Sequence, residues 1–308
     1  MTSPQLTIGS RGSDLALYQA NFIRDILITR HGCDVDIRMI KTAGDKIDNV
    51  SFDKMEGKGF FTKELEDALL AREIDLAVHS LKDLMTTQPD GLKLGAAGYR
   101  ASRHELLLIN PGAHSENGVL PVKPGSIIGT SAARRKAQIA FHNPELRIED
   151  LRGNVPTRVA KLRKGDYAAI LVAAAGMERL KLDLSDIVAV PLDPRTFLPA
   201  PAQGILGIQI RTDDPRVESV VSKLGSAEEV AAAHLERGLL AMFDSGCSLP
   251  LGVYSEKRGG DYCLKAVLGV RAGDGWEGLR RTEVTGNDIP KLIAQAYSRL
   301  REAVVCRA

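Results

Sequence analysis

Residues 74–84 have the sequence IDLAVHSLKDL, in which an apolar run changes abruptly into a polar one. The apolar part, residues 74–78, follows a charged helical pattern and is typical of a short buried strand. In open α/β sheets, ligands bind outside the carboxyl ends of the strands. The polar part therefore makes Asp83 a candidate for chemistry, although an Asp beside Lys82 is also typical of a plain surface ion pair. We interpret His79 as mainly structural.

The length, composition and net charge of the chain limit the class of protein. A chain of 308 residues, 44% hydrophobic and 26% charged, is typical of a soluble globular protein with two or three domains. The net charge of +2 gives no bulk basicity for binding nucleic acid or an anionic membrane. No apolar run approaches ~18 residues, and no secretory signal is recognisable. The four cysteines have no metal-binding spacing, so we expect a cytoplasmic protein with free thiols.

The first third of the chain alternates between strand and helix patterns. Residues 6–8 and 33–42 have strand patterns, and apolar residues recur at helical spacing over residues 14–31, with Ser13 placed as the helix cap. A strand, a helix and a strand in sequence form a βαβ unit, which predicts a parallel sheet. Further elements are predicted as a helix from residue 60 to 69 and strands at 92–97 and 106–109.

The rest of the chain carries two more groups of elements. The middle group predicts strands at 127–128, 146–151 and 168–172 and helices at 132–141 and 154–164, the second capped by Asn154 with Pro156 in its first turn. The final group predicts a helix at 228–243, strands at 251–254 and 262–270, a hairpin turn at 273–275 and a helix at 290–303. Four prolines within residues 191–201 indicate a crossing segment between domains. The pattern predicts a second α/β unit followed by a small α+β domain.

Three strand–loop–helix junctions share one design: Gly9–Ser13, Gly129–Arg135 and Arg152–Asn154. Each combines backbone N–H groups at a helix N-terminus with hydroxyl or amide donors and a guanidinium, which matches a carboxylate or a phosphate. Three such junctions predict a ligand with several anionic groups spread over a wide cleft. The chain contains neither G-x-x-x-x-G-K-S/T nor G-x-G-x-x-G, so nucleotide phosphates are not specifically indicated.

The basic residues are concentrated in one part of the chain. Residues 130–165 contain nine basic and three acidic side chains, in a chain whose net charge is only +2. For Lys161, Arg163 and Lys164 a solvated helix face is the favoured interpretation. The arginines at 134, 135 and 152 differ because they lie just after strand ends, at helix starts.

Two further loops are candidates for function. The segment Asp244–Gly252 places Cys247 between a glycine and a serine, where a reagent could reach it, although buried or incidental cysteines are commoner. No Cys–His pairing supports a protease-type nucleophile. Residues 44–59 carry seven charged residues and three glycines, which is typical either of a mobile active-site loop or of a merely solvated one.

An ordered series of motifs resembles the porphobilinogen deaminase (hydroxymethylbilane synthase) family. The matching segments are Ile8–Ala16, Gly57–Glu66, His79–Asp83, Gly129–Arg135, Leu151–Arg158, Ala173–Gly176, Gln203–Gly204 and Gly246–Cys247. Several are weak singly, but their order over residues 8–252 is very specific. The resemblance implies two doubly wound α/β domains resembling type II periplasmic binding proteins, plus a small α+β C-terminal domain.

The resemblance also implies the activity. It predicts a transferase of tetrapyrrole biosynthesis that deaminates four porphobilinogen units, joins them head to tail on a dipyrromethane cofactor, and releases hydroxymethylbilane by hydrolysis. The cofactor would be held by a thioether to Cys247 and would stay attached through turnover. Each pyrrole carries an acetate and a propionate, which explains arginines and hydroxyls at several helix starts.

By the family pattern, individual residues take individual roles. Asp83 would be the general acid on the departing amine and the counter-charge for the azafulvene cation. Cofactor-binding residues would be Cys247, Lys82, Asp83, Thr130, Ser131, Arg134, Arg135, Arg152 and Gly153. Substrate-binding residues would be Arg11, Ser13, Lys58, Arg152 and Arg158, and residues 44–59 would be the family's mobile loop. No metal, nucleic acid or membrane partner is expected.

The resemblance further suggests domain limits and an oligomeric state. We predict domain 1 at residues 1–100 and 197–218, domain 2 at 101–196 and domain 3 at 219–308, in a monomeric protein. Three stretches depart from the family pattern, and in one of them Ala132-Ala133 stands where Ser-Leu or similar is common. Residues 84–87 replace a small apolar residue followed by proline, and residues 99–105 replace an Arg-Glu-Asp-Pro-Arg-Asp pattern. They leave every expected acid, thiol and key arginine in place and bear on hinge geometry near residue 100.

Two other functions would use some of the same features. A non-catalytic, periplasmic-type receptor for a polycarboxylate metabolite would need the same sheets and arginines but neither Cys247 nor Asp83 beside Lys82. A nucleic-acid binder would need aromatic residues among the basic ones, and residues 130–165 offer only Phe141.

Overall fold

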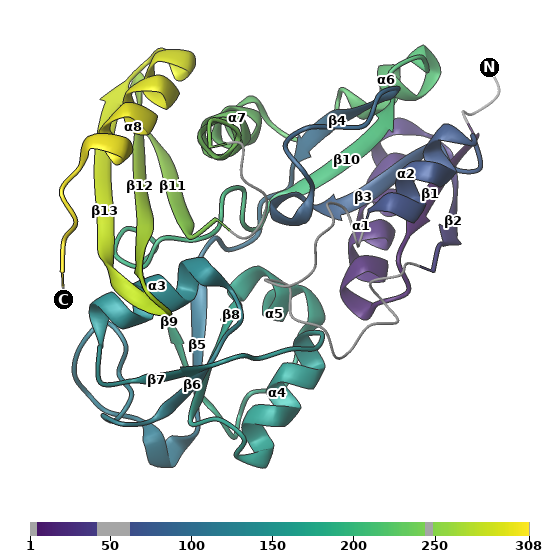
Figure 1. Cartoon of the computed structure of the whole chain (residues 1–308). Helices are drawn as coiled ribbons and strands as arrows, with labels where there is room; N and C mark the ends of the chain where they lie inside the picture. The colour runs from purple at the N-terminus through teal and green to yellow at the C-terminus, as the bar shows by residue number, and fades with distance from the viewer. Residues whose placement is uncertain (1–4, 42–61, 244–248, 308) are drawn as a thin grey trace. The chain divides into compact units, whose positions relative to one another are not determined.

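The computed structural model describes residues 5–41, 62–243 and 249–307 (Figure 1). The chain divides into two compact units, Met1–Ala101 with Gly204–Val230 and Ser102–Gln203 with Ala231–Ala308. Each unit is described by itself below.

The first unit is built on a five-stranded sheet. Its strands are β1 (Gln5–Ser10), β2 (Asp34–Met39), β3 (Leu76–Ser80), β4 (Leu92–Gly98) and β10 (Leu206–Arg211), in the order β2-β1-β3-β10-β4. β1 runs parallel to β2 and β3, whereas β10 is antiparallel to β3 and β4. The carboxyl ends of β1 and β3 therefore meet at one edge of the sheet.

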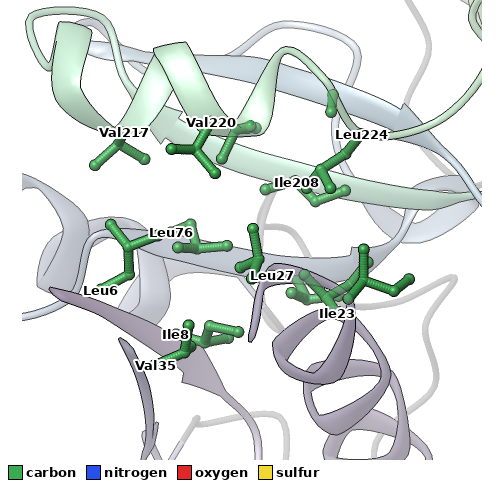
Figure 2. Close-up of a cluster of buried hydrophobic side chains, with 14 of the residues drawn as sticks. Leu6, Ile8, Ile23, Leu27, Val35, Leu76, Ile208, Val217, Val220 and Leu224 are labelled. Carbon is green, nitrogen blue, oxygen red and sulfur yellow. The ribbon is translucent and has the colours of Figure 1, made fainter. Parts of the chain in front are cut away.

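Helices cover both faces of this sheet. The helices are α1 (Asp14–His31), α2 (Lys63–Leu70) and α6 (Pro215–Val221), with the 3₁₀ turn η3 (Leu81–Asp83) after β3. Figure 2 shows the face covered by α1 and α6, where Ile23, Leu27 and Val217 are fully buried against the sheet. Leu65 and Leu69 of α2 pack in a separate cluster, with Ala77 of β3. Two covered faces make the sheet doubly wound.

The limits of α1 follow from its end residues. The Ser13 hydroxyl accepts a hydrogen bond from the N–H of Ala16 at 3.4 Å, which confirms the predicted cap. At the other end Gly32 adopts the left-handed conformation with φ 64°, and its N–H bonds to the Ile28 and Leu27 carbonyls.

The second unit repeats the same sheet order with different chain segments. Its strands are β5 (Glu105–Ile109), β6 (Ile127–Gly129), β7 (Arg147–Glu149), β8 (Ala169–Ala173) and β9 (Val188–Pro191), in the order β7-β6-β8-β5-β9. β6 is parallel to β7 and β8, and β5 is antiparallel to β8 and β9. In each sheet the fourth strand in order is thus the antiparallel one, and the carboxyl ends of three parallel strands share an edge.

Helices also cover both faces of the second sheet. They are α3 (Ala133–His142), α4 (Val155–Lys164) and α5 (Ala174–Leu180), with a 3₁₀ turn at Pro111–Ala113. Ile139 of α3 packs in one apolar cluster, and Leu162 of α4 with Met177 of α5 in another. Asn154 caps α4 by accepting from the N–H of Thr157 at 3.0 Å, as predicted.

The end of the chain adds a three-stranded antiparallel sheet to the second unit. Its elements are α7 (Ala227–Ala241), β11 (Leu251–Arg258), β12 (Asp261–Ala272), β13 (Gly275–Gly286) and α8 (Ile289–Glu302). Leu235 of α7 and Leu292 and Leu300 of α8 are buried against its strands in a core of their own. No helix in the described part of the chain is long and apolar enough to cross a membrane.

The topology confirms the predicted fold class of two doubly wound α/β sheets and a small α+β C-terminal part. Most predicted elements lie within one to three residues of their observed limits. Two elements of the first unit were not predicted: β10, in which all six residues are buried, and α6.

Candidate active site

Asp83 ends the turn η3, which follows β3 directly. The turn is held to its own unit by a hydrogen bond from the Leu81 N–H to the Ile205 carbonyl, at 2.9 Å. Leu81 is fully buried, Lys82 is half-buried and Asp83 is exposed. A buried leucine thus anchors a short turn that presents a carboxylate at the carboxyl edge of the sheet.

Arg11 and Ser13 lie at the same edge, in the loop after β1. β1 pairs with β3 in parallel, with Gly9 opposite Ala77, so the loop after β1 and the turn after β3 are neighbours. A Cβ atom on Gly9 would collide with Ile74, which explains a glycine at this position. The first unit therefore brings together four of the predicted site residues: Arg11, Ser13, Lys82 and Asp83.

Gln19 belongs to this edge but was not predicted. It lies on α1 with 2% of its surface exposed, and its amide donates to the Ser80 hydroxyl at 2.8 Å. A polar residue among the buried positions of an amphipathic helix needs a buried partner. That signal was present in the sequence, because Gln19 precedes Ala20 and Ile23 on the apolar stripe.

In the second unit, predicted residues follow the ends of two neighbouring parallel strands. Thr130 and Ser131 come after β6, and Arg152 and Gly153 come shortly after β7. The Thr130 N–H bonds to the Glu149 carbonyl at 2.8 Å, and the Ser131 hydroxyl donates to the Leu151 carbonyl at 2.9 Å. The two loops are therefore tied together at the carboxyl edge of the sheet.

Gly153 has a conformation that favours glycine. Its φ is 105°, in the left-handed region, and a Cβ atom there would come within 2.6 Å of the Thr157 side chain. Its carbonyl accepts from the Nε of Arg158 at 2.7 Å. The loop thereby fixes the direction of Arg158, another of the predicted substrate-binding residues.

Arg134 and Arg135 are buried and share one partner, Glu105. Arg134 donates through Nη2 to one carboxylate oxygen at 2.5 Å, and Arg135 donates through Nε and Nη2 to the other at 3.0 and 2.6 Å. Further bonds run from Arg134 to the Leu198 carbonyl at 2.8 Å and from Arg135 to the Leu171 carbonyl at 2.9 Å. Burial is the main cause that lowers the pKa of Arg134, against the opposing effect of Glu105.

The sequence identifies Glu105 only as the last residue of the stretch 99–105, which departs from the family pattern. It is fully buried at the first position of β5, a strand in which all five residues are buried. A carboxylate at such a position requires a cation. The sequence signal for this ion pair was an acidic residue at the first position of an otherwise apolar strand.

Two predicted residues, Cys247 and Lys58, lie outside the described residues, as does the loop at residues 44–59. Their roles stay predictions.

The fold and the site together define an α/β protein with arginine-bearing and hydroxyl-bearing loops at the carboxyl edges of two doubly wound sheets. A family model described as "Porphobilinogen deaminase, dipyromethane cofactor binding domain" matches residues 6–219. The chain belongs to the porphobilinogen deaminase family.

Curated relatives agree with this assignment. A porphobilinogen deaminase of Maridesulfovibrio salexigens is 42% identical over 255 residues, which are 82% of this chain and 80% of the relative. One from a Nitratiruptor species is 40% identical over 270 residues, 87% of this chain and 84% of the relative. Among solved structures, a periplasmic substrate-binding protein of an ABC transporter from Coxiella burnetii is 15% identical, with a TM-score of 0.41 over 76% of this chain and 97% of that chain.

The family assignment makes this chain a transferase of tetrapyrrole biosynthesis with a dipyrromethane cofactor. It deaminates porphobilinogen and joins four units head to tail before hydroxymethylbilane is released. The non-catalytic receptor is not favoured. Each edge by itself presents hydroxyls and guanidiniums, which are the kinds of partner that acetate and propionate carboxylates require.

Proposed function

We propose that Asp83 is the general acid of each elongation step. The observation that carries this role is its placement, exposed at the end of β3 beside the loop that holds Arg11 and Ser13. Its proton would go to the amine of porphobilinogen, which leaves as ammonia, and the carboxylate would then face the cation formed on the substrate. After condensation the same carboxylate would accept the proton lost from the pyrrole carbon.

The proposed carboxylate-binding groups come from both units. Arg11, Ser13 and Lys58 belong to the first unit by sequence, and Thr130, Ser131, Arg152, Gly153 and Arg158 to the second. The Arg134–Arg135 pair keeps a net positive charge in the presence of Glu105, because two guanidiniums share one carboxylate. That surplus charge supports its proposed role in binding cofactor carboxylates. The dipyrromethane cofactor supplies the pyrrole carbon to which the first substrate unit is joined.

The role of Asp83 is tested by Asp83→Asn, with Asp90→Asn as an exposed control on the same unit. Turnover in Asp83→Asn is expected to fall at least ~10²-fold, which is typical of losing general acid catalysis. Circular dichroism and the unfolding midpoint should stay as in the parent protein. Near-normal turnover in Asp83→Asn would exclude the role.

Cofactor attachment through a thioether to Cys247 is the second proposal. Intact-mass measurement of the purified protein should show an adduct of two linked pyrroles that is absent from Cys247→Ala. Cys33→Ala is the matched control, since Cys33 is a buried free thiol in the apolar core of the first unit. An unmodified protein with full activity would rule out this attachment.

The arginines proposed to bind carboxylates are tested one at a time. Arg152→Leu is expected to slow particular elongation steps, because each added unit places its carboxylates at a different point of the site. Quenched-flow separation of the enzyme-bound species measures each step. Equal slowing of every step would count against carboxylate binding by Arg152.

Monomeric state, cytoplasmic location and the three-domain division are also proposals. Free thiols at Cys33, Cys263 and Cys306 support a reducing compartment. Light scattering after size exclusion should report one chain, and cell fractionation should place the protein in the cytoplasm. The division at 1–100 with 197–218, 101–196 and 219–308 has its last boundary inside α6, and limited proteolysis can test where the chain is first cut.

A further inference from the structure

A chain of buried polar side chains lies beneath the turn that carries Lys82 and Asp83. The His79 ring nitrogen Nε2 is 3.1 Å from the Gln209 amide oxygen. The Gln209 amide nitrogen donates to Gln88 at 2.8 Å and to Glu66 at 3.3 Å, and the Gln88 amide nitrogen donates to the Met85 carbonyl at 2.6 Å. All of these residues belong to the first unit.

The direction of each bond follows from the donors. Because the Gln209 nitrogen donates to the Gln88 amide oxygen and to a Glu66 carboxylate oxygen, the Gln209 oxygen faces His79, and Nε2 of His79 must carry the proton. Burial, the largest cause, together with the nearby charge of Arg11, lowers the pKa of His79 to about 4. The imidazole is therefore neutral and donates from Nε2 to a fully buried amide.

The two ends of this chain are attached on opposite sides of the turn. His79 lies in β3, two residues before the turn begins, and Met85 lies two residues after Asp83. Within the turn itself, the described backbone bond from the Leu84 N–H to the Leu81 carbonyl is long, at 3.3 Å. The segment from Leu84 to Gln88 contains no proline that would restrict its backbone.

We propose that Gln88, Gln209 and His79 form a brace that positions Asp83. The brace links the strand before the turn to the carbonyl after it, so the turn is restrained from both sides and not only through Leu81. The three side chains act through the backbone and need not touch substrate, which makes them positioning residues. The proposal rests on the proposed role of Asp83.

The brace also explains why amides lie at these positions. Gln209 is fully buried on β10, where an apolar side chain would be the ordinary choice. A buried amide that lacks partners is costly, whereas Gln209 uses its oxygen and both N–H groups. Only Gln88 is partly exposed, so it can be changed with the least effect on the core.

The test uses Gln88→Met in the cofactor-loaded enzyme, because methionine keeps the side-chain length but cannot bond Met85 or Gln209. Thr87→Val, at the exposed neighbouring position, is the matched control. Hydrogen exchange of the peptide spanning residues 79–90 should quicken about fivefold in Gln88→Met, as expected for losing the bond that holds the Met85 carbonyl. In the same variant kcat should fall roughly tenfold with KM unchanged, because misplacing a catalytic group affects the chemical step.

A double-mutant cycle with Asp83→Asn separates positioning from a general loss of structure. If the brace acts through Asp83, the fall in kcat caused by Gln88→Met disappears once the carboxylate is absent. Unchanged exchange in Gln88→Met, or additive losses in the cycle, would overturn the proposal. Near-normal turnover in Asp83→Asn together with quickened exchange would instead reject the role of Asp83, and the brace would stand only as a restraint on the turn.

Discussion

The two sheets share one strand order, yet their carboxyl edges hold charge in opposite ways. At the first edge, Asp83 is exposed on a three-residue turn and Lys82 is half-buried beside it. At the second edge, Arg134 and Arg135 are buried and divide the two oxygens of Glu105 between them. One edge presents an accessible acid, and the other holds a fixed cation pair.

The difference agrees with the roles proposed for the two groups. An acid that exchanges protons with successive substrates has to be reachable, and its carboxylate therefore contributes little to the core. Cations that have to stay charged away from water require a buried counter-charge. We therefore expect substitution of Asp83 to change the rate before the stability, and substitution within the buried group of Glu105, Arg134 and Arg135 to change the stability before the rate.

The largest expected effect on stability belongs to Glu105→Gln. Without the carboxylate, two buried guanidiniums lose their counter-charge, and breaking a buried pair in this way costs about 3–5 kcal/mol. Urea denaturation measures this loss, and Glu145→Gln, a substitution at an exposed position, is the control. A loss below about 1 kcal/mol would contradict the comparison, because the buried ion pairs of the second edge would then contribute no more to stability than an exposed pair does.

The second prediction concerns pH and the core under the first edge. The pKa of His79 is about 4 in the folded protein, below its ordinary value of 6.5, so the unfolded chain takes up the proton first as the pH falls. The contribution of His79 is complete above pH 6.5 and is lost between pH 6.5 and about 4, by roughly 3 kcal/mol. Free energies of unfolding across this range should depend less on pH in His79→Gln. If the free energy of unfolding depended on pH in the same way in the parent protein and in His79→Gln, the lowered pKa of His79 would be contradicted.

A smaller effect is expected for Gln19→Met, which removes the donor to the Ser80 hydroxyl while keeping the length of the side chain. The loss of one such hydrogen bond is about 1 kcal/mol. Chemical denaturation measures it, and Asn21→Met, on the partly buried side of the same helix, provides the control. Equal losses in both variants would mean that the bond to Ser80 has no special weight.

The smallest effect is expected on α4. Arg163 is exposed and pairs with Asp186 at 2.7 Å, and exposed pairs of this kind contribute little. Arg163→Ala should therefore leave turnover and the unfolding midpoint unchanged, in contrast to Arg152→Leu in the loop that precedes the same helix. A marked fall in turnover would extend the carboxylate-binding surface along α4.

Much of the fold could be predicted because its signals are local. The helical spacing of Leu17, Ala20, Ile23 and Leu27 and the flanking Ser13 and Gly32 define α1 without reference to the rest of the chain. β10 could not be predicted in this way. Its place between β3 and β4 depends on pairing with strands more than a hundred residues earlier, and its burial on both faces removes any alternation.

The candidate site divides in the same way. Motif order and chemistry pointed to Asp83, the arginines and Cys247. The structure brings Arg11, Lys82 and Asp83 to one edge and Thr130, Ser131 and Arg152 to another. The partners of those residues were not visible in the sequence. Glu105 lies some thirty residues from Arg134, and Gln209 lies 130 residues from His79.

The sequence by itself determined the family, the α/β class and the residues able to do the chemistry, because these depend on local pattern and on side-chain type. Only the tertiary structure decided which polar groups are buried and what satisfies them. Burial makes an unpaired charge or amide costly, so each such group selects a partner in space. The Glu105 pairing and the brace under Asp83 are both results of that selection.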